Sequence, residues 1–170
     1  MAERHLVVDN LKFAYEGLCN PAEIYNLVST FFYERGWDWV EKMNQEEASP
    51  SGKQVRLILQ PYLNRSDYYK QVINIKIHMI NLNRVEIEHE NQTLSLHRGV
   101  IRIVYNGYVV SDRKDKWIKK PFFWFISLIF ERYFFRQHFA KFTSEVETEI
   151  SNLSTKIKNY LNVFKYTYER

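Results

Sequence analysis

Residues 72–82 read VINIKIHMINL, and the alternation of apolar and polar side chains in this stretch decides the predicted fold class. Successive side chains of an extended chain point to opposite sides, so a period of two predicts a β-strand with one apolar face. Such a strand is typical of an antiparallel sheet that buries one face and exposes the other. The apolar positions are Ile73, Ile75, Ile77 and Met79, and the polar positions between them are Asn74, Lys76 and His78.

The same period extends outward from this strand in both directions. It predicts further strands over residues 5–16, 37–43, 55–59, 85–88, 94–97 and 101–110. Polar residues predict connections over residues 46–52, 62–69, 81–84 and 89–92. We expect bulges where the alternation shifts, at Asp9-Asn10, at Gly99 and at Asn106-Gly107.

An amphipathic helix is predicted from Asn20 to Gly36. Asn20 is a good capping residue, Pro21 suits the first turn, and Glu23 has the spacing of a capping box. Gly36 suits the position after the helix, where φ is usually positive. The apolar face consists of Ile24, Leu27, Val28, Phe31 and Phe32.

A second amphipathic helix is predicted over residues 143–164. Its apolar side chains recur at steps of three or four from Phe142 to Phe164. One unbroken helix beginning at Ile118 would be about 70 Å long, which exceeds the width of a domain of this size. We therefore expect a break near Lys141.

A further helix is expected over residues 121–139, which read PFFWFISLIFERYFFRQHF. Nine of these nineteen residues are Phe, Tyr or Trp, and the uncharged part is shorter than the roughly 20 apolar residues that span a bilayer. Apolar side chains cover most of its circumference, so the helix needs a partner surface. That surface is either the chain's own sheet or a ligand, a membrane surface or another chain. The candidate residues for a ligand site or an interface are Phe122, Trp124, Phe125, Tyr133 and Phe135.

A basic segment precedes this aromatic helix. Positive charge at a helix N-terminus opposes the helix dipole, so the segment indicates either an anionic contact or a solubilising collar. The anion would be a phosphate, a lipid head group, RNA or an acidic partner. Nucleic-acid binding usually shows a larger basic footprint, and no RNP-type or KH-type signature occurs. The cations are Arg113, Lys114, Lys116, Lys119 and Lys120.

Composition suits one ordered domain over residues 1–170. Apolar residues make up 45% of the chain, aromatic residues 16% and charged residues 26%, and the net charge is +4. Cys19 is the sole cysteine, so no internal disulfide can form. The first ten residues lack the apolar core of a signal peptide, and no transmembrane segment is apparent. The cytosol is the expected compartment.

The order of predicted elements is strand, helix, five or six alternating strands, then helices. It predicts an α+β fold with a curved antiparallel sheet of six to seven strands, packed against an N-terminal helix and two C-terminal helices. This order resembles the START-like helix-grip fold, also called the SRPBCC superfamily. The resemblance implies a sheet wrapped around a C-terminal helix and, often, an apolar cavity. The local sequence pattern also resembles that of small archaeal proteins without a described activity.

No catalytic or metal-binding motif emerges from the residues. The five histidines and Cys19 do not cluster at the spacing of metal ligands, and the glycines form no phosphate-binding loop, so no metal or cofactor is expected. Cys19 beside a helix start is either an activated thiol or, as we expect, a small buried filler. An enzyme would need a polar group within the fold, for which the candidates are Tyr105, Tyr133 and His138.

Three functions follow from these observations. The first is a non-enzymatic binding domain that encloses an apolar small molecule or lipid between the sheet and the helices. The second is an interaction module, in which residues 113–120 and 121–139 dock on an anionic membrane surface, on a protein partner or on a second copy of the chain. The third is an enzyme of the helix-grip type. We favour the first over the other two.

Overall fold

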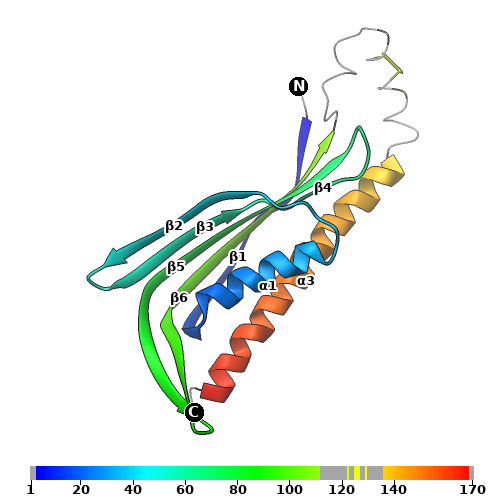
Figure 1. Cartoon of the computed structure of the whole chain (residues 1–170). Coiled ribbons are helices and arrows are strands. Elements are labelled where there is room, and N and C mark those ends of the chain that lie inside the picture. Colours follow the sequence, from blue (N-terminus) through cyan, green and yellow to red (C-terminus); the bar gives the residue numbers. More distant parts are fainter. Residues whose placement is uncertain (1–2, 112–121, 123–124, 127–128, 130–135, 169–170) are drawn as a thin grey trace.

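The computed structural model describes residues 3–111, 122, 125–126, 129 and 136–168. Its elements form one six-stranded antiparallel sheet and two long helices (Figure 1). In chain order these are β1 (Glu3–Cys19), α1 (Pro21–Tyr33), β2 (Glu41–Ser49), β3 (Gly52–Leu59), β4 (Tyr62–Asn64), β5 (Lys70–His89), β6 (Gln92–Ser111) and α3 (Arg136–Tyr168).

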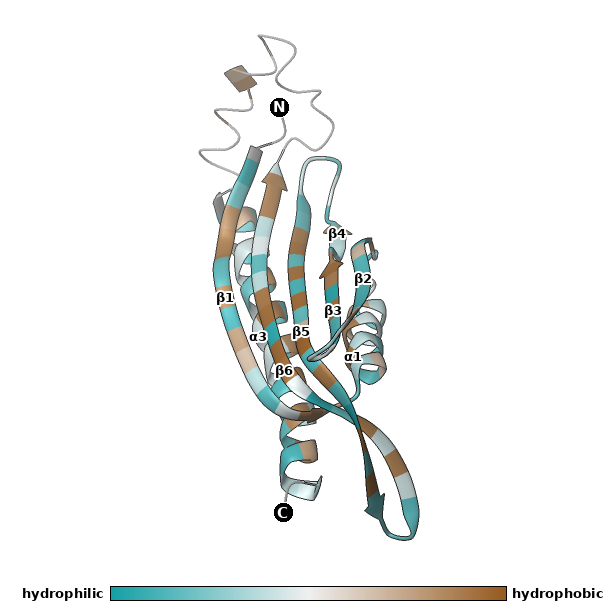
Figure 2. Ribbon diagram, turned by 90° about the vertical axis from the view of Figure 1, so that its left-hand side faces the viewer, coloured by the Kyte–Doolittle hydropathy of each residue, from teal (hydrophilic) through white to brown (hydrophobic). Residues whose placement is uncertain are grey.

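The strands follow one another across the sheet in the order β1-β6-β5-β3-β2, and the short β4 pairs with β5. Both helices lie on the same face of this sheet, which we call the inner face (Figures 1 and 2). The opposite, outer face carries no helix among the described elements, and Figure 2 looks onto it with α1 and α3 behind the strands. The predicted α+β class and the antiparallel pairing are thereby confirmed.

The alternation of residues 72–82 places its apolar side chains against the helices. Ile73, Ile75, Ile77 and Met79 are at most 1% exposed, and they share one core with α1 and α3. The residues that α3 contributes to this core are Val146, Ile150, Leu153, Ile157 and Leu161, which recur at helical spacing. The residues from α1 are Ile24, Val28, Phe31 and Phe32.

The start of α1 follows the predicted cap. The side-chain oxygen of Asn20 accepts a hydrogen bond from the backbone N–H of Ala22. Glu23 reaches back to the Asn20 side-chain amide, 3.1 Å away, rather than to its backbone N–H. Gly36 has a φ of +70°, as expected after a helix.

The prediction of three helices was wrong for the described residues, which form two. α3 runs unbroken from Arg136 to Tyr168, so the expected break near Lys141 does not occur. Its 33 residues correspond to about 50 Å of helix at 1.5 Å per residue. The 20 residues of β6 span about 66 Å at 3.3 Å per residue, so the sheet is long enough to support the whole helix.

The lengths of β5 and β6 were underestimated, because a turn was predicted within β5. The turn predicted over residues 81–84 is a bulge, where the register of β5 shifts between Ile80 and Asn83 and Asn81 takes a φ of 54°. The hairpin turn comes later, at Glu90-Asn91, where both residues have positive φ. The bulge faces Gly99 of β6, where an added Cβ would lie only 2.7 Å from the Ile80 carbonyl oxygen.

Of the two other predicted bulges, the one at Asp9-Asn10 is confirmed and the one at Asn106-Gly107 is not. β6 passes through Asn106-Gly107 in regular register with β5, so the bulge expected there is absent. The irregularity lies in the partner strand β1, between Leu6 and Leu11, where Asn10 takes a φ of 47°. The side-chain oxygen of Asn106 accepts the backbone N–H of Asn10 and so satisfies the group that the bulge frees.

Only the first three residues of the edge strand β2 fall within a predicted strand, because most of β2 is polar. Residues 46–49 were expected in a turn, and residues 37–40 in a strand, but β2 spans Glu41–Ser49. Its side chains are almost all exposed, and Glu46 pairs with Lys53 of β3 at 2.6 Å. Charged side chains on an edge strand discourage pairing with other chains. Trp37 instead packs on Phe32, with ring centroids 5.4 Å apart.

The far ends of β5 and β6 bend around the last turns of α3, and we call this the hairpin end of the sheet (Figure 1). A small second core forms there from Leu18, Leu96 and Phe164. His89 at the tip also contacts the ring of Tyr168, with centroids 5.2 Å apart. The opposite end, where β6 ends and β1 and β5 begin, is called the Ser111 end.

Gly107 gives a direct test of the contact between α3 and the sheet. An added Cβ at Gly107 would lie 2.6 Å from Cγ1 of Val146 and 2.9 Å from Cδ1 of Ile150, which is closer than real Cβ contacts allow. We expect Gly107→Ala to reduce the free energy of unfolding in denaturant by about 1–3 kcal/mol through overpacking.

Val146→Ala removes the atom that the new Cβ would strike. The double variant should therefore be more stable than the sum of the two single losses predicts. Strictly additive losses would show that α3 does not press on Gly107.

Candidate functional site

The outer face carries a groove at the Ser111 end of the sheet. Two neighbouring rows of paired residues cross the strands there, because the register aligns Tyr62 with Val72 and Val72 with Tyr108. In the next row, Lys70 is aligned with Val110, which is aligned with Arg4 of β1. Directly paired side chains on one face of a sheet lie about 5 Å apart, so each valine has a long side chain on both sides.

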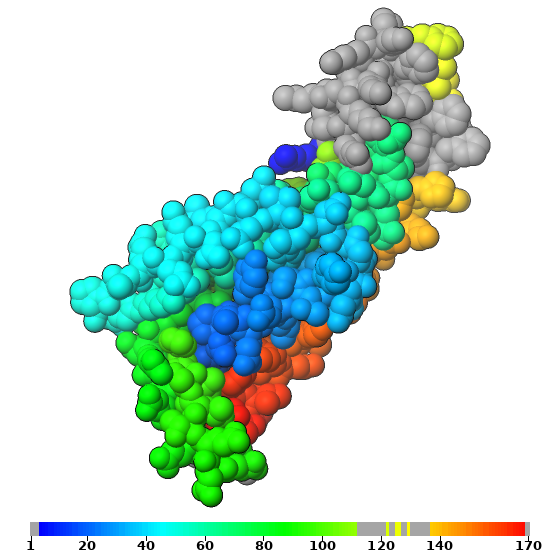
Figure 3. Space-filling model, viewed as in Figure 1, coloured from blue at the N-terminus to red at the C-terminus, as the bar shows by residue number. Residues whose placement is uncertain are grey.

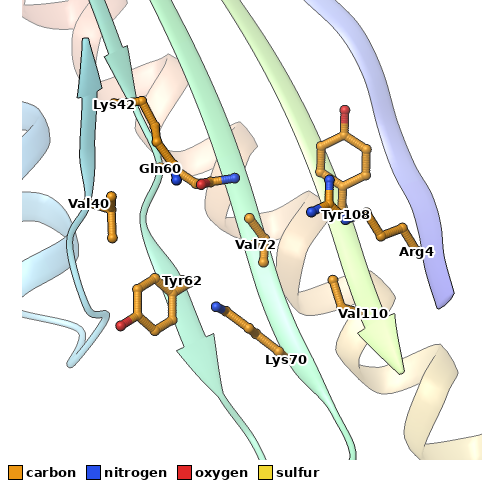
Figure 4. A pocket seen from close by; sticks show the side chains of 9 residues that line it. All are labelled: Arg4, Val40, Lys42, Gln60, Tyr62, Lys70, Val72, Tyr108 and Val110. Atoms are coloured by element: carbon orange, nitrogen blue, oxygen red, sulfur yellow. The ribbon is translucent and has the colours of Figure 1, made fainter. Parts of the chain in front are cut away.

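This arrangement explains why two valines are buried on a face without helices. Val72 lies between two tyrosines and Val110 between two cationic side chains, and each is 8% exposed. The long side chains rise above the valines and form the walls of a groove of about 450 Å³ (Figure 4). Its lining residues are Arg4, Val40, Lys42, Gln60, Tyr62, Lys70, Val72, Tyr108 and Val110.

The groove is cationic. Arg4, Lys42 and Lys70 contribute three positive charges, and no Asp or Glu is among its lining residues. Lys70 Nζ lies 3.8 Å from the centroid of the Tyr62 ring, which holds the ammonium group over the aromatic face. Figure 4 shows the Lys42 side chain beside that of Gln60, while Arg4 lies next to Tyr108.

Two other hollows are less suited to a charged ligand. One of about 290 Å³ lies between the start of α1 and strands β2 and β3, and its Glu46 and Lys53 already neutralise each other. The other, of about 530 Å³, includes one residue of each charge, Glu16 and Arg98, beside Gly17 and Gly99. The groove at the Ser111 end is therefore the strongest candidate for an anion.

Positive charge continues along the outer face beyond the groove. His78 of β5 is aligned with Arg56 of β3 on one side and with Arg102 of β6 on the other. Burial is the main cause of a lowered pKa at His78, and the two guanidinium groups lower the pKa further. Its Nε2 atom is buried without a hydrogen-bond partner among the described residues. His78 is thus neutral at pH 7, as a histidine between two cations should be.

The predicted ligand or interface residues are described in part. Phe122 and Phe125 are helical and exposed, by 71% and 60%, and Ile129 on the same stretch is 48% exposed. Trp124, Tyr133 and Phe135 lie outside the described residues. So do all five predicted anion contacts, Arg113, Lys114, Lys116, Lys119 and Lys120.

Among the remaining candidates, Tyr105 and Cys19 are buried, whereas His138 is exposed on α3. Tyr105 is fully buried, and burial raises the pKa of its phenol well above the ordinary value, with Ser154 of α3 as its polar neighbour. His138 stacks at a tilt on Phe142, with ring centroids 6.4 Å apart. Cys19 is buried, which raises the pKa of its thiol to about 12 and makes it the expected unreactive filler. Over the described ranges, no three potential metal ligands come together.

A polar network joins the sheet to the start of α3. The fully buried Gln71 donates to the Phe142 carbonyl and to the Glu145 carboxylate, each at 3.0 Å. Arg65 donates to Gln71 at 2.9 Å and to Glu145 at 2.6 Å. Each polar group of this network has a partner, which fits a structural role in fixing α3.

Sequence reasoning missed the groove because its residues come from distant positions. Arg4, Lys42 and Lys70 stand singly in ordinary stretches of sequence, and only the strand register aligns their rows. One signal of the groove was available in the sequence. Val72 and Val110 are apolar at positions that the alternation assigns to the solvent face.

Comparisons with known proteins add no family. No protein-family model matches the chain, and a search of curated proteins finds no match. Across the described helices, none has the length and apolar character needed to cross a membrane.

Protonation of His78 should destabilise the folded chain. Its lowered pKa means that the folded chain binds this proton more weakly than the unfolded chain. The corresponding stability is complete above the ordinary histidine pKa of about 6.5 and falls as the pH drops toward the folded value. We expect His78→Gln to lose less unfolding free energy than the wild type between about pH 7.5 and about pH 5 in denaturant titrations.

Arg102→Gln is the matched variant, since it removes one of the two charges that lower this pKa. Its loss of stability on acidification should fall between those of the wild type and His78→Gln. An unchanged pH dependence in both variants would contradict the assignment.

Proposed function

We propose that this chain is a non-enzymatic docking domain whose Ser111 end binds an anionic membrane surface. The proposal is based on three exposed apolar side chains at helical spacing. Phe122, Phe125 and Ile129 are spaced by three and four residues, and each is about half exposed or more. Exposed apolar side chains of this kind are typical of a surface that another phase or molecule covers.

The apolar side chains suit the interfacial region of a bilayer. Their spacing of three and four residues is that of side chains on one side of an α-helix. Complete burial of a Phe or Ile side chain is worth about 1.5–3 kcal/mol, so even partial insertion of three such residues yields measurable binding. The described residues of this stretch lie beyond the Ser111 end, away from α1 and the hairpin end (Figure 3).

The positive charge near the Ser111 end supports an anionic lipid surface as the binding partner. The segment 113–120 carries five cations and one acid, and it separates the end of β6 from the apolar stretch along the chain. Each cation close to an anionic leaflet contributes about 1 kcal/mol. Arg4, Lys42 and Lys70 add positive charge at the same end of the sheet. A basic segment next to exposed aromatic residues combines the two contributions to interfacial binding, which are the burial of apolar side chains and the attraction to anionic lipids.

A second candidate function follows from the strand order. β1 pairs with β6, the last strand, and α3 crosses the inner face after it, which supports a helix-grip arrangement for this sheet. That arrangement implies an apolar small molecule or lipid held between α3 and the sheet. The described part of this space is packed with buried side chains, so we rank the apolar ligand second.

Vesicle flotation tests the docking proposal. The full chain should float with vesicles of phosphatidylserine and phosphatidylcholine at about 0.1 M salt, and less at about 0.5 M salt because the ions screen the charges. It should not float with phosphatidylcholine alone. Phe122→Ser/Phe125→Ser should weaken binding at least about tenfold, because the variant loses apolar side chains that insert.

Val163→Ser/Tyr166→Ser is the matched control. Both residues are exposed apolar side chains, by 59% and 70%, on the last turns of α3 at the hairpin end. This control should float like the wild type. Failure of the wild type to float on anionic vesicles, or equal losses in the two variants, would refute docking by the Ser111 end.

A further inference from the structure

We propose that the groove at the Ser111 end binds a phosphate-bearing organic molecule. Arg4, Lys42 and Lys70 would hold the phosphate, and the valine floor would accept the organic part. This site goes beyond membrane docking, since most of its residues belong to strands of the sheet and none to residues 121–139. It would serve a soluble phosphate ester or the head group of an anionic lipid through the same chemistry.

The charge of the groove selects the class of ligand. Three cationic side chains, with no carboxylate among the lining residues, favour an anionic ligand. Phosphate esters carry up to two charges near neutral pH and offer three terminal oxygens as acceptors. Arginine matches phosphate geometry with two parallel N–H donors, and lysine contributes a point charge.

The groove also supplies neutral donors and an apolar surface. The Tyr62 and Tyr108 hydroxyls and the Gln60 amide belong to its lining, so they can complete hydrogen bonds around the anion. Its volume of about 450 Å³ falls in the range of small-molecule pockets, roughly 300–1,000 Å³, and exceeds what a bare phosphate ion fills. The floor of Val72 and Val110, with Val40 at one side, is suited to the carbon atoms of an ester.

The walls of the groove are held by paired strands. Arg4, Lys70, Val72, Tyr108 and Val110 all belong to β1, β5 and β6, whose pairing is continuous through these positions. Strands two apart in a sheet are separated by about 10 Å, so Arg4 and Lys70 stand on opposite sides of Val110 at a distance that one phosphate ester can bridge. Sites on strands are more rigid than sites on loops, which lowers the entropy lost on binding.

Isothermal titration calorimetry on the full chain tests the site with two probes. One probe is sn-glycerol 3-phosphate, and the other is dihexanoyl phosphatidic acid below the concentration at which it forms micelles. Glycerol and dihexanoyl phosphatidylcholine are the neutral and zwitterionic controls. We expect at least one phosphate probe to bind, and neither control. Binding of glycerol 3-phosphate favours a soluble ligand, and binding of phosphatidic acid alone favours a lipid head group.

Variants locate the binding in the groove. Arg4→Gln/Lys42→Gln should weaken the probe at least about tenfold, because two charge-assisted contacts are lost. Arg56→Gln/Arg102→Gln removes the same charge from the same face outside the groove and should change affinity less than about twofold. Val110→Phe keeps every charge but fills the floor, and it should also weaken binding. Thermal unfolding checks that each variant is folded.

Two outcomes would overturn the proposal. Absence of binding by both phosphate probes to the folded wild type is one, and equal weakening by the two double-charge variants is the other, because it would indicate general attraction to a basic face. The membrane proposal can be refuted independently of this one. Phe122→Ser/Phe125→Ser leaves the groove intact, so it should bind the soluble probe like the wild type whether or not the chain docks on vesicles.

Discussion

The packing of α3 against the inner face of the sheet determines how the other elements are arranged. The helix approaches β6 so closely at Gly107 that no side chain fits beneath Val146. Apolar residues along the length of α3 meet the alternating residues of β5 and β6, and the Gln71–Arg65–Glu145 network fixes the start of the helix. A 33-residue helix needs a long surface, and the 20-residue strands β5 and β6 provide it.

Covering one face of the sheet determines the chemistry of the other. Every strand position that points away from α3 is left to the outer face, where cations such as Arg56, Lys76 and Arg102 accumulate and His78 is kept neutral between two of them. Near the Ser111 end, the same register places valines between long side chains and so forms a cationic groove with an apolar floor. The exposed Phe122, Phe125 and Ile129 follow in the chain after β6 ends. The cationic groove and these exposed apolar side chains thus lie toward the same end of the sheet (Figure 3).

The sequence predicts which side chains of a strand are buried better than it predicts the lengths of the strands and helices. Alternation identified the inner face of β5 correctly, and Asn20 and Gly36 marked the limits of α1, because both signals are local. The polar edge strand β2 has no apolar period to detect, and Asn81 looks like a turn residue although its positive φ forms a bulge. The groove could not be predicted, because the alignment of Arg4, Val110 and Lys70 depends on the register of three strands. The aromatic and basic segments were recognised by composition, which indicates a surface but not its partner.

If the Ser111 end binds the membrane, the backbone at that end should become protected when vesicles are added. Hydrogen–deuterium exchange of the full chain, with and without vesicles containing phosphatidylserine, locates this protection. We expect new protection in residues 113–130 and at the adjoining ends of β1, β5 and β6, with the hairpin end around Glu90 unchanged. Protection centred on the hairpin end, or spread evenly over the outer face, would contradict binding by the Ser111 end.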